Sequence, residues 1–381
     1  MGGATMTEAE APEAEATRAT TIVDCDVHPL IGDVADLRPF MSTRAVRRVF
    51  GQQVQVYARD PNRSPHPTSG LRLDARTPSG GAPGSDPAFA LEQWIDRYEI
   101  AAAILIPVQA GVVIPWGDEE VGVEFLRAMN RYFLERWTGL DPRFRVTLSV
   151  SPYNVPAAVA EIERHADVPG IAGVFIPAAG VGLGRSHYFP IYEAAERYRM
   201  PIVLHPTGAE GNLAEAPRLA GGLPDTYPER HAMLLQPGQA ILASMVFAGI
   251  FERFPSLKLV LSEYGTTWAA PMAWRMDNAW EQGEGSLAAL PLPPSHYVNR
   301  NVRFTTQPLD EPPETAMLHE FLELLDAGRT LMFSSDYPHW DTDEPRYILN
   351  SRLPAGLRTR IAVETARECF GDRLGLEAAT A

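Results

Sequence analysis

The sequence predicts an α/β fold, a distorted (β/α)8 TIM barrel with long loops after its first and fifth strands. Eight short apolar runs that suit buried strands alternate with longer segments of helical periodicity. The chain has 381 residues, which exceeds the roughly 250 that such a barrel requires. The alternative is an open doubly wound sheet. The glycine-rich run GVGLG at 180–184 supports it only weakly, because such runs are often simple turns.

The order of the elements follows from this alternation. Helical periodicity is clearest over 121–137, 155–166 and 314–328. Two connections, 51–87 and 206–228, are longer than usual and leave the carboxyl ends of predicted strands, where barrel enzymes bind their substrates. The predicted strands are 20–26, 100–107, 143–150, 170–177, 201–206, 257–263, 301–307 and 329–336.

We expect one domain over 20–372, between a disordered N-terminal tail at 1–19 and a C-terminal tail at 373–381. The first tail is rich in Ala, Glu and Thr and lacks an apolar signal core. No window of the sequence approaches the roughly 18 uninterrupted apolar residues of a membrane span. These features predict a cytoplasmic protein that does not associate with a membrane.

Charge and cysteine content exclude several functional classes. The formal net charge is −15 and no run of Lys or Arg appears, so a nucleic-acid partner is not expected. Cys25 and Cys369 are the only cysteines, too few for a disulfide framework or a thiolate metal site. The expected partner is a small-molecule substrate.

Polar residues gather at the carboxyl ends of particular strands. Asp26 and His28 end the first strand, and the period-two geometry of a strand points both side chains the same way. His205 ends the fifth strand, Glu263 the sixth and Asp336 the eighth. Because the first and eighth strands of a closed barrel are neighbours, Asp26, His28 and Asp336 are expected to converge, with His205 reaching in from the opposite wall.

This convergence predicts a metal centre. Two imidazoles and two carboxylates, from Asp26, His28, His205 and Asp336, suit one divalent ion, Zn²⁺ or Mn²⁺, with an open position for water or substrate. A single histidine at a strand end is more often an ordinary hydrogen-bonded residue, and a single aspartate often caps a helix. The prediction therefore depends on all four positions together.

Four motifs resemble the amidohydrolase-related family, and most closely its aminocarboxymuconate-semialdehyde decarboxylase-like branch. They are DCDVHP, IVLHP, ERFPSLKLVLSEYGTTWAAPMAWRMD and MFSSDYPHWD. The resemblance covers nearly all of 20–372. It implies a distorted (β/α)8 barrel with one divalent metal, commonly dimeric, whose members include non-oxidative decarboxylases, hydrolases and hydratases. Its metal-ligand positions fall on Asp26, His28, His205 and Asp336, while Glu263 replaces the strand-six histidine of better-known decarboxylases.

The single lysine restricts the chemistry further. Binuclear amidohydrolases bridge their metals with a carboxylated lysine on strand four, and the run GVFIPAAG contains none. Lys258 opens the sixth strand, at the amino end of the barrel, so it is also misplaced for Schiff-base catalysis. A mononuclear site remains.

Aromatic and histidine residues near the strand ends are candidates for the pocket. Trp268 follows the strand-six loop and either walls the pocket or packs in the core. Tyr337 and Trp340 are expected to line or support the rim. His339 either contacts the substrate or a metal ligand, or it anchors its loop. His231, after the second long loop, is expected at the surface or at a helix cap, with a catalytic role as the alternative.

The leading functional hypothesis is non-oxidative decarboxylation of a small aromatic or unsaturated carboxylic acid. Asp336 would transfer the proton, with Glu263 and His339 as further catalytic candidates. The alternative is metal-dependent hydrolysis of a C–N, C–O or C–C bond in a small carbonyl compound, with a bound water of pKa roughly 7. A non-catalytic binding barrel is the third possibility. Homodimerisation is expected from the resemblance alone.

Overall fold

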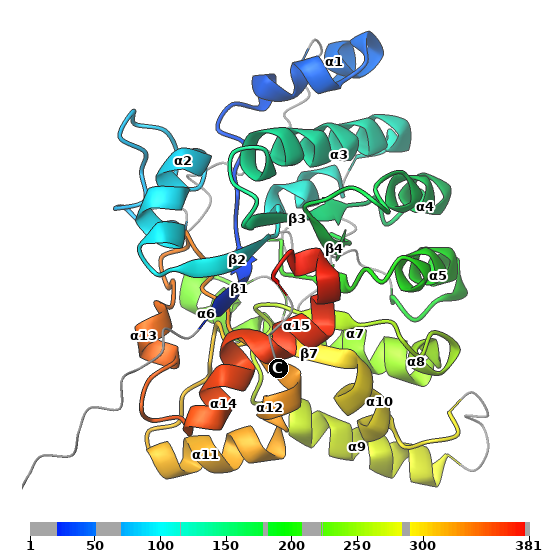
Figure 1. The fold of residues 1–381 in the computed structure, drawn as a ribbon. Coiled ribbons are helices and arrows are strands. Elements are labelled where there is room, and N and C mark those ends of the chain that lie inside the picture. The colour runs from blue at the N-terminus through cyan, green and yellow to red at the C-terminus, as the bar shows by residue number, and fades with distance from the viewer. Residues whose placement is uncertain are drawn as a thin grey trace, which may run out of the picture.

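Eight parallel strands lie side by side in sequence order and curve into a barrel surrounded by helices (Figure 1). The computed structural model describes residues 21–50, 70–114, 116–177, 182–207, 222, 224–283 and 290–377. The (β/α)8 fold predicted from the alternation of elements is therefore confirmed. The strands are β1 (Ile22–Val27), β2 (Ile100–Leu105), β3 (Phe144–Ser149), β4 (Ile171–Phe175), β5 (Ile202–Leu204), β6 (Leu259–Leu261), β7 (Val302–Thr305) and β8 (Leu331–Met332).

The helices form the outer layer of the barrel (Figure 1). They are α1 (Thr43–Phe50), α2 (Pro87–Ala90), α3 (Glu119–Phe133), α4 (Val155–Arg164), α5 (Phe189–Arg197), α6 (Tyr227–Met233), α7 (Leu235–Phe247), α8 (Ile250–Arg253), α9 (Ala269–Gln282), α10 (Pro294–Asn301), α11 (Thr315–Leu324), α12 (Ala327–Thr330), α13 (Pro345–Ile348), α14 (Ala355–Thr359) and α15 (Thr365–Phe370). Short 3₁₀ or π segments are η1 (Val34–Phe40), η2 (Leu91–Asp96), η3 (Val108–Val113), η4 (Leu134–Thr138), η5 (Ser186–Tyr188), η6 (Arg360–Glu364) and η7 (Gly371–Leu374).

Helix starts follow the local sequence. The Asp118 side chain accepts a hydrogen bond from the backbone N–H of Val121 at the start of α3, and Asn154 does the same for Ala157 at the start of α4. Both helices were predicted, and both turn buried apolar residues toward the strands. None of the described helices combines the length and apolarity needed to cross a membrane.

The barrel closes through backbone hydrogen bonds beyond the last residue of β8. The N–H of Cys25 donates to the carbonyl of Phe333 at 2.9 Å, and the N–H of Asp336 donates to the carbonyl of Asp26 at 3.0 Å. A parallel bridge joins Val27 to Tyr337. The loop after β8 thus continues along β1, which brings Asp336 beside Asp26.

The eighth strand is shorter than the predicted run 329–336. Only Leu331 and Met332 pair with β7, because the preceding residues belong to α12 and the following ones turn to β1. The helix predicted over 314–328 is also interrupted. It ends at Leu324, and Asp326 adopts a left-handed conformation with φ of 51° before α12 begins. A left-handed residue cannot continue a right-handed helix.

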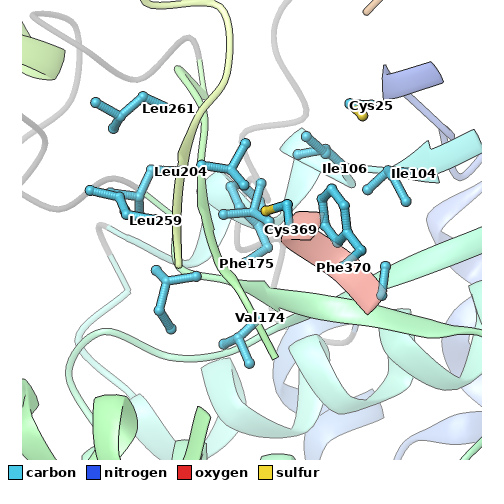
Figure 2. Close-up of a cluster of buried hydrophobic side chains, with 14 of the residues drawn as sticks. Cys25, Ile104, Ile106, Val174, Phe175, Leu204, Leu259, Leu261, Cys369 and Phe370 are labelled. Carbon is cyan, nitrogen blue, oxygen red and sulfur yellow. The ribbon is translucent and has the colours of Figure 1, made fainter. Parts of the chain in front are cut away.

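The C-terminal segment seals the amino end of the barrel. Figure 2 shows Cys369 and Phe370 of α15 among apolar side chains from the barrel strands. Arg373 then donates to the backbone carbonyls of Ala166, Ile171 and Tyr198. The packed structure therefore extends past residue 372, where the predicted C-terminal tail begins. Lys258 lies at the same end and donates to the carbonyl of Arg300 at 2.7 Å, away from the strand ends that carry the candidate ligands.

Several predicted features lie wholly or partly outside the described residues. These are the N-terminal tail at 1–19, residues 51–69 of the first long loop, most of the second long loop at 206–228, the start of the GVGLG run and the last four residues.

Candidate metal centre

The four predicted ligands meet at the carboxyl end of the barrel, and all four are buried. One ligand atom from each of Asp26, His28, His205 and Asp336 lies within 4.8 Å of the others. Nε2 of His28 lies 3.1 Å from Oδ1 of Asp26 and 2.8 Å from Oδ1 of Asp336. Nε2 of His205 lies 3.2 Å from Oδ2 of Asp26. Asp26 thus stands between the two imidazoles.

Hydrogen bonds on the far side of each ring fix which nitrogen faces the cluster. Nδ1 of His28 lies 2.9 Å from the carbonyl of Ile106, and Nδ1 of His205 lies 2.6 Å from the carbonyl of Pro206. A carbonyl only accepts, so each Nδ1 carries the hydrogen. Each Nε2 is therefore turned inward, which is the arrangement found in histidine metal ligands.

The buried atoms of this cluster fit a cation. Oδ1 of Asp26 and Nε2 of both His28 and His205 are buried and make no hydrogen bond with correct geometry to the described residues. Lone pairs of nitrogen and oxygen that face one another at about 3 Å repel unless a proton or a cation lies between them. Two imidazoles and two carboxylates are suitable donors for a divalent transition metal.

The charges of the cluster shift the pKa values of its members in the protein alone. Burial lowers the pKa of His28, but the charge of Asp26 and the hydrogen-bond contacts with Asp26 and Asp336 together raise it to about 10. Burial opposes ionisation of Asp26, yet His205 and His28 hold its pKa well below the ordinary value. Burial raises the pKa of Asp336 to about 7. Protons and a bound cation therefore compete for the same atoms.

Two candidate site residues have unusual backbone conformations. Glu263, just after β6, has φ of 59°, and Asp336, after β8, has φ of 61°. Residues other than glycine rarely adopt this left-handed region, and holding them there costs of the order of 1–3 kcal/mol. Such conformations concentrate at functional sites. Here they turn the chain sharply at the point where the carboxylates enter the site.

Glu263 and His339 join the four ligands. Oε2 of Glu263 lies 2.9 Å from Nε2 of His205, and the side chain is 11% exposed. Nδ1 of His339 lies 2.5 Å from Oδ1 of Asp336, and its ring centroid lies 4.6 Å from that of His28. His28, Glu263, Asp336 and His339 also form a second possible ligand group. All the predicted metal and catalytic candidates are therefore brought together.

Two of the three predicted aromatic pocket residues are buried in packing contacts. Tyr337 was expected at the rim, but its ring is buried and stacked on Trp94, and its hydroxyl donates to Gln93. Its backbone bridge to Val27 turns the side chain toward the outer layer. Trp268 is also buried: its indole N–H donates to the carbonyl of Tyr264, and its ring packs edge-on against β7. These contacts agree with the alternative in which Trp268 packs in the core.

Trp340 is the exposed member of the three. Its side chain is 45% exposed, and its indole N–H donates to the hydroxyl of Tyr227 on α6 at 2.8 Å. His231, one turn along α6, forms an ion pair with Asp341 at 3.1 Å, and its side chain is 25% exposed. Sequence patterns could not find this contact, because it joins two loops distant in the chain.

Asp24 is a buried carboxylate that the sequence analysis did not single out. Its Oδ1 accepts from the N–H groups of Asp26 and Ser335, and its Oδ2 accepts from Trp94 Nε1 and Ser335 Oγ. Burial raises its pKa to about 7, while these hydrogen bonds act in the opposite direction. These hydrogen bonds hold Ser335, the residue before Asp336, in place. The available signal was a second acidic residue in the buried strand that carries Asp26, since such a group requires partners.

The fold and this cluster define a class of protein: a (β/α)8 barrel with a candidate metal centre at the carboxyl ends of its strands. The chain belongs to the amidohydrolase family, whose model, described as Amidohydrolase, matches residues 23–371. The family resemblance inferred from the sequence motifs is therefore confirmed.

Individual relatives are distant. A gamma-resorcylate decarboxylase from Polaromonas sp. (strain JS666 / ATCC BAA-500) is 24% identical over 299 residues, 72% of this chain and 85% of the relative. A 2-amino-3-carboxymuconate-6-semialdehyde decarboxylase from Dictyostelium discoideum is 22% identical over 64% of each chain.

Solved structures show the same fold. A 5-carboxyvanillate decarboxylase from Sphingomonas paucimobilis has a TM-score of 0.66 at 20% identity, covering 92% of this chain and 99% of its own. A dihydroxybenzoic acid decarboxylase from Polaromonas sp. JS666, solved with manganese and the inhibitor 2-nitroresorcinol, has a TM-score of 0.64 at 19% identity, covering 93% and 97%.

Proposed function

We propose that this protein is a mononuclear, metal-dependent decarboxylase that removes CO₂ from a small aromatic or unsaturated carboxylic acid without oxidation. One observation carries the metal dependence: Nε2 of His28, Nε2 of His205 and Oδ1 of Asp26 are buried, face one another and lack hydrogen bonds among the described residues. The reaction is supported by the relatives, which are named as decarboxylases of such acids.

Asp26, His28, His205 and Asp336 would hold the ion. The structural neighbour from Polaromonas contains manganese, so Mn²⁺ is our first candidate and Zn²⁺ our second. A divalent ion held there supplies a Lewis acid that neutralises charge on the substrate's carboxylate and an adjacent oxygen. The remaining chemistry belongs to the protein.

Asp336 is the proposed proton donor to the substrate carbon that loses CO₂. Its carboxyl group lies between His28 and His339, where it is placed to take up and release a proton. In the metal-free protein, burial raises its pKa to about 7. His339 is placed to return a proton to Asp336 after each turnover because its Nδ1 contacts Oδ1 of Asp336. Glu263 orients His205 through their 2.9 Å contact.

The proposed site also excludes water from much of its floor. Asp26, His28, His205 and Asp336 are each at most 1% exposed, which strengthens the electrostatic interactions among them. Trp340 stays a proposed substrate contact, because it is the exposed aromatic residue of the strand-eight loop. Tyr337 and Trp268 are buried, and each makes a hydrogen bond away from the metal ligands. We propose that they do not contact the substrate and only hold the loops after β8 and β6 in place.

The test is a screen of aromatic and unsaturated carboxylic acids with protein loaded with Mn²⁺. We expect stoichiometric CO₂ release with at least one ortho-hydroxylated aromatic acid, and no release from protein treated with a chelator. Release of a hydrolysis product without CO₂ would instead support the hydrolase alternative, in which Asp336 takes a proton from the attacking water. No turnover of any acid by protein shown to contain metal would contradict the proposal.

A homodimer and a cytoplasmic location stay predictions from the sequence. The dimer is tested by light scattering of the purified protein, where the mass should be twice that of the 41.9 kDa chain.

A further inference from the structure

Helix α6 lies against the loop that follows β8. The indole N–H of Trp340 donates to the hydroxyl of Tyr227, and Nε2 of His231 lies 3.1 Å from Oδ2 of Asp341. The three rings also contact one another, with centroids 6.0 Å apart for Tyr227 and Trp340, 6.1 Å for Tyr227 and His231, and 6.4 Å for His231 and Trp340. Helix α6 and the loop after β8 thus form one aromatic cluster.

This aromatic cluster of Tyr227, His231 and Trp340 stands close to the candidate metal centre. The charges of Glu263 and Asp336 act on His231, and the charge of Glu263 acts on Tyr227. Asp341 in turn acts on both Asp336 and His339. Electrostatic effects of this kind fade within about 10 Å in salt solution. The chain places the cluster at the same end of the barrel, because Trp340 and Asp341 directly follow His339, which contacts Asp336.

His231 combines an ion-pair contact through one ring nitrogen with a second ring nitrogen that can donate. The contact with Asp341 raises the pKa of His231 above its ordinary value, against the effect of burial. Nε2 faces Asp341, and no hydrogen bond joins Nδ1 to another described residue. An imidazolium held in this way can donate through Nδ1 to an oxygen atom on a ligand, and such charge-assisted bonds are stronger than neutral ones.

We propose that His231, held by Asp341, binds the polar group of the substrate at the end opposite to the metal centre. This inference rests on the proposed function and assigns its substrate class more narrowly: a planar aromatic acid with a hydroxyl or second anionic group on the far side of the ring. Trp340, which is 45% exposed and lies beside His231, is the aromatic side chain that we propose contacts that ring. His231 also offsets the negative charge of Glu263, Asp336 and Asp341, which would repel an anionic ligand.

The other polar residues near the site are less suited than His231 to bind the distal group of the substrate. Strand six ends in a carboxylate, Glu263, and a carboxylate cannot donate a hydrogen bond to an anion at neutral pH as an imidazolium can. His339 is engaged with Asp336 beside the metal ligands. His231 is therefore the imidazole placed to recognise the distal part of a ligand and not its reacting carboxylate.

The test compares His231→Gln and Asp341→Asn with His296→Gln, whose histidine lies exposed on α10. With Mn²⁺-loaded enzyme and the acid found in the screen, we expect KM to rise about tenfold in His231→Gln and less in Asp341→Asn, with kcat within about a factor of three. The control should match the parent protein. Unchanged KM in His231→Gln, or a large loss of kcat at constant KM, would overturn the inference.

A binding measurement separates this inference from the proposed reaction. The absorbance of 4-hydroxy-3-methoxy-5-nitrobenzoic acid, the ligand of a manganese-containing 5-carboxyvanillate decarboxylase structure, is titrated with the Mn²⁺-loaded protein and its variants. This compound carries a carboxylate across the ring from its hydroxyl and so offers the distal anionic group that His231 is proposed to bind. A tenfold weaker affinity in His231→Gln, with metal content unchanged, supports the inference even if no acid is decarboxylated. Equal affinity in the variant and the parent overturns it even if decarboxylation is found.

Discussion

Oε2 of Glu263 lies 2.9 Å from Nε2 of His205, on the same side of that ring as Oδ2 of Asp26. A carboxylate at the end of strand six therefore contacts a proposed metal ligand directly. It does not form a salt bridge to a surface arginine among the described residues. Its backbone is held in the left-handed region, which strengthens the interpretation that its position is functional.

Replacement of Glu263 by Gln should lower turnover at least tenfold while the protein stays folded. The amide keeps the shape but loses the charge that orients the imidazole and helps to balance a bound cation. Turnover and metal content are measured beside Glu281→Gln, an exposed residue of α9. If Glu263→Gln matches this control in both measurements, Glu263 has no role in the site.

Purified protein should retain one divalent ion per chain. At a free Mn²⁺ concentration about 100 times the dissociation constant, binding should add roughly 2.7 kcal/mol to the free energy of unfolding. Metal analysis gives the stoichiometry, and thermal unfolding with and without chelator gives the stabilisation. Two ions per chain, or no retention after reconstitution, would contradict a mononuclear centre.

Replacement of Asp336 by Asn should reduce activity by roughly 10² or more, the scale of lost acid–base catalysis. Asn keeps the size of the side chain but cannot hold and release a proton. Asp343→Asn, in the same loop, is the matched control. An Asp336→Asn enzyme that keeps most of its activity would refute this role, whatever its metal content.

The stability of the metal-free protein should fall with rising pH, while its affinity for the metal should increase. The pKa of His28 is raised from 6.5 to about 10, so its proton contributes stability that is fully present below about pH 6.5 and lost as the pH rises through about 10. A cation needs the same Nε2 without its proton. Between about pH 7 and pH 9, Tm of the metal-free protein should fall while the increase in Tm caused by Mn²⁺ should grow. A metal-induced increase that shrinks with pH would contradict this.

Replacement of Asp24 by Asn should destabilise the protein by about 2–3 kcal/mol. The amide nitrogen cannot accept the hydrogen bonds that Trp94 and Ser335 donate to Oδ2. Asp33→Asn is the control, because Asp33 is an exposed N-cap that Asn replaces well. Urea unfolding of the metal-free proteins measures the difference, and equal midpoints for the two variants would show that these hydrogen bonds contribute little.

The sequence predicted the barrel and the ligand set because both depend on local patterns. Strand ends carry Asp26, His28, His205 and Asp336, and parallel strands bring such ends to one edge. The direction of individual side chains depends on contacts between distant segments. The side chain of Tyr337 turns toward the outer layer because its backbone pairs with β1 and its ring stacks on Trp94.

The lengths of the strands also could not be predicted from local sequence patterns. The run 329–336 is apolar at first and reads as one strand, yet only Leu331 and Met332 pair with β7. The length of β8 is set by its neighbouring strands. From Phe333 onward the backbone forms hydrogen bonds with β1 and no longer pairs with β7. The ion pair of His231 with Asp341 depends on how helix α6 meets the loop after β8. Contacts of this kind leave no periodic pattern in a single sequence.

The link between Asp24 and Ser335 spans 311 residues and has a consequence for synthesis of the chain. A ribosome releases β1 first, and its hydrogen-bonding partners after β8 emerge only when translation is nearly complete. Until then Asp26 and His28 cannot form a complete ion-binding cluster with Asp336, and one edge of β1 is unpaired. A nascent chain stalled before Leu331 should therefore bind no manganese tightly and should depend on chaperones, while release of the last residues completes both the barrel and its capacity for metal.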